Sequence, residues 1–97
     1  MIRFLVAAVL ILAATPASGQ AVPCAPRDVV LSTMLERYGE VLTGVGVAGG
    51  GVLVELLVAP GGATFTILAT TASGISCLQA TGEGWRTVAP VVPEQPT

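Results

Sequence analysis

The spacing of apolar residues changes near Glu40, and this change separates a helical part of the chain from a sheet-forming part. Before Glu40, apolar side chains recur every three or four residues, as they do along one side of an amphipathic helix. These residues are Val30, Leu31, Met34, Leu35 and Tyr38. Proline is tolerated in the first turn of a helix, and glycine commonly ends one, so Pro26 and Gly39 mark the two ends. The pattern predicts a helix over residues 26–38.

After Glu40, segments rich in Val, Ile, Leu and Thr are separated by glycine clusters, which is typical of antiparallel strands joined by tight turns. The predicted strands are residues 40–48, 52–59, 63–70 and 75–81. Turns recur about every eleven to twelve residues, which suits consecutive hairpins. We therefore expect an α+β fold, with one N-terminal helix packed on a four-stranded antiparallel β-meander.

The second predicted strand is apolar on both faces. Leu53 and Leu57 lie beside Glu55 on one face, and residues 52, 54, 56 and 58 occupy the other. One helix can cover only one face of such a sheet. Leu53 and Leu57 are therefore expected to form a surface for a partner or a second copy of the chain, or to be shielded by the C-terminal tail.

The first nineteen residues have the features of a secretory signal peptide. Arg3 provides a positive charge, residues 4–14 are apolar, and small residues follow. Cleavage is expected after Gly19, with cleavage after Ala21 as the alternative. A helix needs about twenty apolar residues to span a membrane, so we expect no stable membrane anchor after cleavage. The protein is predicted to be periplasmic or secreted.

Cleavage after Gly19 leaves 78 of the 97 residues, enough for one small domain over residues 20–87 and a proline-rich flexible tail over residues 88–97. Three arginines against six acidic residues give this part a formal charge of −3, and it has no lysine. The absence of a basic cluster argues against nucleic acid as a partner. Without histidine, the chain lacks the residues for a usual zinc site or a Ser-His-Asp triad, so we predict no metal, cofactor or catalytic residue.

The two cysteines are far apart in the sequence. Cys24 precedes the predicted helix and Cys77 lies in the last predicted strand. In an oxidising compartment we expect them to form a structural disulfide, which would stabilise the fold by about 4 kcal/mol on the chain-entropy model. The alternative is a redox-active thiol, although such pairs are usually close in sequence.

The most plausible function from the sequence is a non-catalytic periplasmic binding or accessory module that engages a protein or an envelope component through its sheet. The candidate binding residues are Arg27, Arg37, Leu53, Glu55 and Leu57. One alternative is a small hydrolase that uses Glu40 and Glu55 as paired carboxylates, although few aromatic residues are present to stack on a sugar. Another is a structural homo-oligomer, in which the protein is its own partner.

Several short motifs are shared with a known family. The positions are Cys24 with Arg27, Tyr38-Gly39-Glu40, Glu55, Gly62 with Ala63-Thr64-Phe65-Thr66, Gly74 with Cys77, and Trp85. In this combination the chain resembles an uncharacterised family of small secreted proteins from proteobacteria. It departs from the family pattern by carrying Phe65 where tryptophan is expected, with one extra residue before it. The resemblance implies a secreted domain held by a disulfide and implies no activity.

Overall fold

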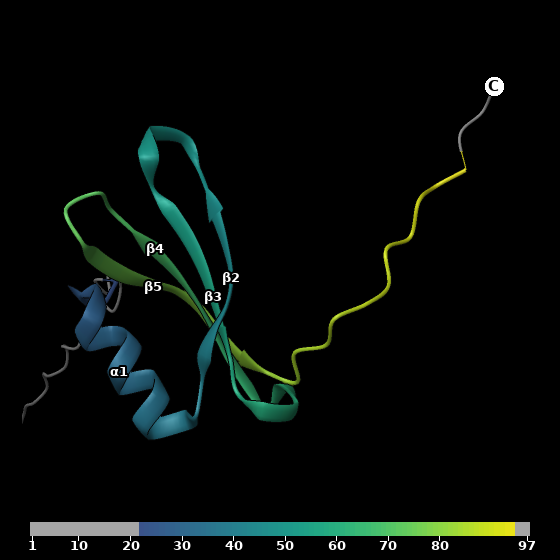
Figure 1. The fold of residues 1–97 in the computed structure, drawn as a ribbon, viewed down its shortest axis with the longest axis horizontal. Coiled ribbons are helices and arrows are strands. Elements are labelled where there is room, and N and C mark those ends of the chain that lie inside the picture. Colours follow the sequence, from purple (N-terminus) through teal and green to yellow (C-terminus); the bar gives the residue numbers. More distant parts are fainter. Residues whose placement is uncertain (1–21, 95–97) are drawn as a thin grey trace, which may run out of the picture.

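The computed structural model describes residues 22–94, so the predicted signal peptide over residues 1–19 and the last three residues of the predicted tail lie outside it. The elements are β1 (Cys24–Pro26), α1 (Arg27–Tyr38), β2 (Val41–Val47), β3 (Leu53–Val58), β4 (Thr64–Thr70) and β5 (Ile75–Glu83). Short 3-10 turns join β2 to β3 and β3 to β4. Figure 1 shows the helix lying against one side of the sheet, with the C-terminal segment running away from it.

The sheet has five strands in the order β1-β5-β4-β3-β2, and all neighbouring strands are antiparallel. Strands β2 to β5 form the predicted meander, but the expectation of four strands is wrong because β1 adds a fifth. β1 is only three residues long and pairs with β5, with Cys24 opposite Cys77. A three-residue strand that includes Pro26 is too short to show the alternation by which strands are recognised.

The helix α1 confirms the predicted helix and begins one residue later than expected. Gly39 follows its last residue in the left-handed conformation, with φ at 71°, which glycine adopts without steric cost. The N–H of Gly39 donates to the carbonyl oxygen of Leu35 at 2.9 Å. This cap ends the helix and turns the chain directly into β2.

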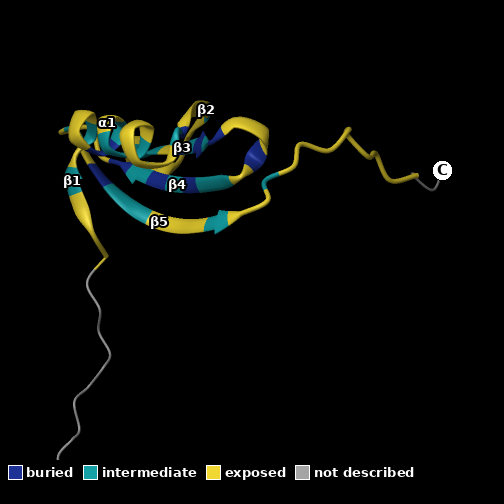
Figure 2. Ribbon diagram, turned by 90° about the horizontal axis from the view of Figure 1, so that it is seen from below, coloured by how far each residue is buried: buried dark blue, intermediate teal, exposed yellow. Residues whose placement is uncertain are grey.

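The helix packs on the face of the sheet that carries Leu57 and Leu68. Leu57 is 1% exposed and Leu68 0% exposed, and both pack with Val30 of α1. Figure 2 shows the buried residues of β3 and β4 beside α1, while the segment after β5 is exposed. The expectation of an uncovered face is therefore wrong for Leu57, which the helix covers, while Leu53 on the same strand face is half-buried. The described part of the tail is exposed and does not shield Leu57. Alternation identifies the residues that share a face, but it does not identify the face that the helix covers.

No element of residues 22–94 covers the opposite face of the sheet, here called the outer face. Its residues on β3 and β4 are Val54, Leu56, Val58, Phe65, Ile67 and Ala69, which are paired across the two strands. None of them is buried, and Val54 is 42% exposed. At one end, the ring of Phe65 lies 5.2 Å from the ring of Trp85. The fold thus has two layers and an apolar outer face.

Candidate functional site

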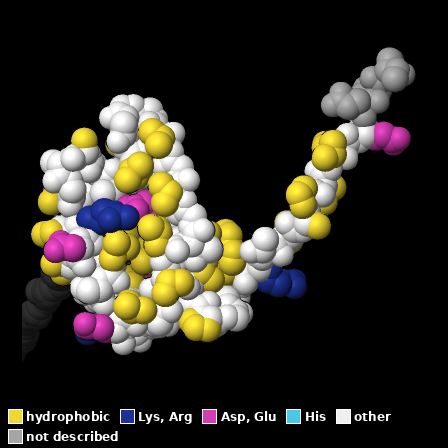
Figure 3. Space-filling view, in the orientation of Figure 1, with side chains coloured by type: hydrophobic (Ala, Val, Ile, Leu, Met, Phe, Trp, Pro, Cys, Tyr) yellow, Lys and Arg dark blue, Asp and Glu magenta, His cyan; other side chains and the backbone are white. Residues whose placement is uncertain are grey.

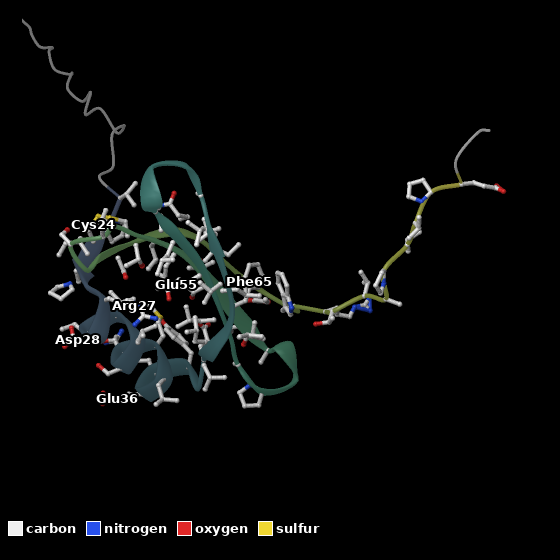
Figure 4. All side chains as sticks on the ribbon, turned by 45° about the horizontal axis from the view of Figure 1, so that its top comes forward. Cys24, Arg27, Asp28, Glu36, Glu55 and Phe65 are labelled. Atoms are coloured by element: carbon white, nitrogen blue, oxygen red, sulfur yellow. A yellow bond between two sulfur atoms is a disulfide. The ribbon has the colours of Figure 1, made fainter. Side chains whose placement is uncertain are left out.

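Glu55, which is buried, forms an ion pair with the partly exposed side chain of Arg27. Glu55 lies in the middle of β3, faces α1 and is 0% exposed. Arg27 is the first residue of α1, and its Nε donates to Oε1 and Oε2 of Glu55 at 3.0 and 3.1 Å. Its Nη2 donates to Oε2 at 2.6 Å, and Figure 4 shows the two side chains pointing toward each other. This forked arrangement, which arginine forms well, ties the start of the helix to the centre of the sheet.

Two hydroxyl groups complete the surroundings of Glu55. Thr70 donates to Oε1 at 2.7 Å, and its hydroxyl also shares a hydrogen bond of 2.6 Å with that of Ser76. The pKa of Glu55 is lowered, chiefly by the hydrogen bonds from Arg27 and also by that from Thr70, while burial acts in the opposite direction. The pKa of Arg27 is raised, mainly through its hydrogen bonds to Glu55. Glu55 is therefore held as a carboxylate and has its partners within the fold.

A second buried carboxyl group belongs to Glu40, which lies between α1 and β2 and is 2% exposed. The hydroxyl of Thr64 donates to Oε2 of Glu40 at 2.7 Å. Oε1 is buried and has no hydrogen-bond partner among residues 22–94. The backbone N–H of Glu40 donates to the carbonyl oxygen of Met34 at 3.2 Å, which fixes the residue at the end of the helix.

Glu40 lines a cavity of about 410 Å³ near the C-terminal end of α1 and the paired ends of β4 and β5. Its lining includes Met34, Tyr38, Thr64, Thr81 and Glu83. Glu55 does not line this cavity. The two glutamates of the hydrolase alternative therefore do not share a cleft, and Glu55 is engaged by Arg27 instead.

The other predicted binding residues are scattered. Arg37 is exposed in the last turn of α1, while Leu53 is half-buried at the start of β3. Sequence reasoning missed the buried hydroxyls of Thr70 and Ser76. A signal for Thr70 was available, because it shares a strand face with Leu68, and polar groups on a buried face require partners.

The predicted disulfide between Cys24 and Cys77 is present, and it links residues 53 positions apart. No helix within residues 22–94 is both long enough and apolar enough to cross a membrane. The same residues contain no cluster of three or more acidic, cysteine or histidine side chains arranged to hold a metal ion.

The strand β2 forms a free edge of the sheet, because it pairs only with β3. Its seven residues include no charged residue and no proline. Val45 is 55% exposed and Val47 75% exposed. Figure 3 shows apolar side chains gathered over β2 and β3 on the face turned to the reader.

Two glycines open the outer face next to this edge. Gly44 lies opposite Leu56, and Gly46 lies opposite Val54. A Cβ atom at Gly46 would meet no atom within 4 Å, so there is space for a larger side chain at this position. The glycines leave the side chains of Leu56 and Val54 uncovered from the side of β2.

Comparison with protein-family models, curated proteins and solved structures found no match to this chain. Within residues 22–94, β2 presents a free edge with exposed apolar side chains, and the cavity beside Glu40 is lined by a residue whose buried carboxyl oxygen has no partner.

Proposed function

We propose that this protein is a non-catalytic binding module of the periplasm or extracellular space that takes up an extended segment of another polypeptide at the edge of β2. The observation that carries the proposal is a seven-residue edge strand with exposed apolar side chains and neither charge nor proline. Soluble proteins usually protect such edges with charges, proline, a β-bulge or a covering element, because an exposed edge pairs readily with other strands. β2 has an irregularity in its pairing between Leu42 and Gly44 but pairs regularly from Gly44 to Val47, and this regular part of the edge is suited to strand addition.

The chemistry of the edge defines the partner. The backbone N–H and C=O groups of β2 that point away from β3 are matched by the backbone of an added strand, which provides both donors and acceptors. On the helix side, the partner's side chains would meet Leu42, Val45 and Val47, which face that side by their register with β3. The glycines on the other side allow contact with the outer face. We therefore expect an uncharged segment with apolar residues at alternate positions.

The cellular location is part of the same proposal. A disulfide persists in an oxidising compartment, and the predicted signal peptide would deliver the chain to one. Glu55 and Leu57 are buried and lie outside the proposed surface, so Val45 and Val47 replace them as the residues expected to contact the partner. The hydrolase alternative has less support, because Arg27 and Thr70 occupy the carboxylate of Glu55.

A peptide selection tests the proposal. The purified protein is panned against displayed random decapeptides, and the selected peptides are titrated in solution. We expect contacts between the peptide Hα and amide protons and those of β2 in nuclear Overhauser spectra. The charge introduced by Val45→Lys should weaken binding about tenfold or more, because it places an ammonium group in the apolar contact. Val88→Lys adds the same charge at an exposed position of the tail and should leave binding unchanged.

Two results would contradict strand addition from another protein. In the first, the selected peptides bind without contacts to β2. In the second, sedimentation shows a dimer that Val45→Lys dissociates while no peptide competes for the edge. The second result would support the homo-oligomer, in which β2 pairs with β2 of another copy.

A further inference from the structure

Glu40 lines the cavity near the C-terminal end of α1, and one of its carboxyl oxygens, Oε1, is buried and satisfied by no group among residues 22–94. An acceptor left buried without a donor is costly, and the cost is larger for a charged group than for a neutral one. The other oxygen of Glu40 accepts from Thr64, so the orientation of the carboxyl group is fixed. The arrangement places an oriented carboxyl group, with one oxygen unpartnered, in the lining of a cavity large enough for a small ligand.

The charges around the cavity favour a cation. Glu83, on β5 opposite Thr64 of β4, also lines the cavity. No lysine, arginine or histidine lines it. The hydroxyl groups of Thr64 and Thr81 are further acceptors at its wall, since a hydroxyl oxygen accepts as well as donates.

The remaining wall suits an alkyl chain. Met34 and Leu78 contribute apolar surface, and the ring of Tyr38, which also lines the cavity, can attract a cation through its face. A divalent metal fits less well, because it prefers several oxygen ligands in a defined geometry, and residues 22–94 hold no cluster of three such acidic side chains. A primary ammonium group offers several N–H donors at one atom and tolerates a looser set of acceptors.

We propose that this cavity binds a primary alkylammonium group, with Glu40 Oε1 as its principal acceptor and Glu83 as a second anionic partner at the rim. The ammonium could belong to a small free amine or to a lysine side chain of a polypeptide. The site is independent of strand addition at β2, so Val45→Lys should leave it unchanged.

The test is a titration of the ¹⁵N-labelled protein with propylammonium chloride at neutral pH, followed by amide chemical shifts. We expect saturable shifts centred on residues 40, 64, 81 and 83. n-Propanol has a similar size but no charge, and tetramethylammonium has the charge but no N–H donor; both should bind at least about tenfold more weakly. N-acetyl-lysine N-methylamide distinguishes the sources. Tighter binding than propylammonium at the same residues assigns the site to lysine side chains, and weaker binding assigns it to small amines.

Matched variants test the acceptor. Glu40→Gln removes the charge at the buried oxygen and should weaken propylammonium binding about tenfold or more. Glu83→Gln should weaken propylammonium binding several-fold. Glu83 is exposed, so this substitution does not disturb the core. Glu36→Gln removes an equal charge from the exposed side of α1, away from the cavity lining, and should have no effect. Three results would overturn the proposal: propylammonium causes no saturable shift up to its solubility limit, Glu83→Gln binds propylammonium as tightly as the control Glu36→Gln does, or tetramethylammonium binds as tightly as propylammonium.

Discussion

Two buried glutamates in this small domain have opposite surroundings. Glu55 is 0% exposed and accepts hydrogen bonds from the guanidinium of Arg27 and the hydroxyl of Thr70. Glu40 is 2% exposed, but only Oε2 has a partner, the hydroxyl of Thr64. A buried charge is tolerated when the fold supplies its partners. The comparison therefore assigns Glu55 to the structure and makes Glu40 available for a ligand.

The position of Arg27 explains why Glu55 is fully partnered. Residues 24–26 pair with β5, and the N–H of Arg27 donates to the carbonyl oxygen of Gly74 at 2.9 Å. The disulfide between Cys24 and Cys77 holds the same segment. The first turn of α1 is therefore fixed over the sheet, where the guanidinium reaches the middle of β3. No equivalent cation lines the cavity at the other end of the helix.

The largest expected effect on stability comes from removing the disulfide that holds the segment before Arg27. Replacing both Cys24 and Cys77 with serine should lower the free energy of unfolding by about 4 kcal/mol, because the unfolded chain is released from a long closed loop. Urea unfolding of the variant and the parent measures the difference. The amides of Glu55 and Thr70 should also lose protection from hydrogen exchange. A loss below about 1 kcal/mol would contradict this role of the disulfide.

Removal of the cation beside Glu55 is the next largest change. Arg27→Met should destabilise the protein by about 2 kcal/mol, since it leaves a buried carboxylate without its main partner. The effect is smaller than for a fully buried pair because the side chain of Arg27 is 36% exposed. Arg37→Met is the matched control on an exposed part of the same helix and should change stability by less than about 0.5 kcal/mol. Equal effects of the two variants in urea unfolding would exclude a special role for Arg27.

The ion pair also predicts a pH dependence of stability. The pKa of Glu55 in the folded protein lies below its ordinary value of 4.5, so folding favours its ionised form. The resulting stabilisation is fully present above pH 4.5 and is lost as the pH falls through the lower pKa of the folded state. Thermal unfolding between neutral and acidic pH should show this loss in the parent protein and a smaller one in Glu55→Gln. An identical pH profile for both proteins would contradict the assignment.

The smallest expected effect is at Glu40. Glu40→Gln retains a carbonyl oxygen for Thr64 and removes the charge from the unpartnered side of the group. The free energy of unfolding should change by less than about 0.5 kcal/mol or increase, because no ion pair is broken. Urea unfolding beside Glu55→Gln measures the contrast. Destabilisation of Glu40→Gln as large as that of Glu55→Gln would show that Glu40 is a structural carboxylate as well.

The sequence predicted the helix, the meander and the disulfide because each leaves a local or compositional signal. The helix shows a three-to-four-residue apolar spacing, and glycine clusters mark the turns between strands. The fifth strand was missed because β1 has only three residues and is positioned by its pairing with β5. The covered face of the sheet was assigned wrongly because both faces of β3 are apolar and the choice depends on where the helix packs.

The candidate sites were only partly predictable for a related reason. Arg27 and Glu55 were both identified, but their pairing joins residues 28 positions apart and has no local pattern. Glu40 was recognised as a carboxyl group of interest, whereas the cavity beside it also requires Thr81 and Glu83 from the last strand. The exposed edge of β2 depends on strand order, which places β1 and β2 at the two ends of the sheet.

The contrast between the two glutamates is tested most directly by the effect of propylammonium on thermal stability. A ligand that binds only the folded state raises the unfolding temperature, and the increase grows with the ratio of the ligand concentration to the dissociation constant. Propylammonium should raise the unfolding temperature of the parent protein and of Glu36→Gln, and this increase should be absent in Glu40→Gln. An equal increase in Glu40→Gln, or no increase in the parent protein, would contradict the conclusion that Glu40 is held for a ligand while Glu55 is held for the fold.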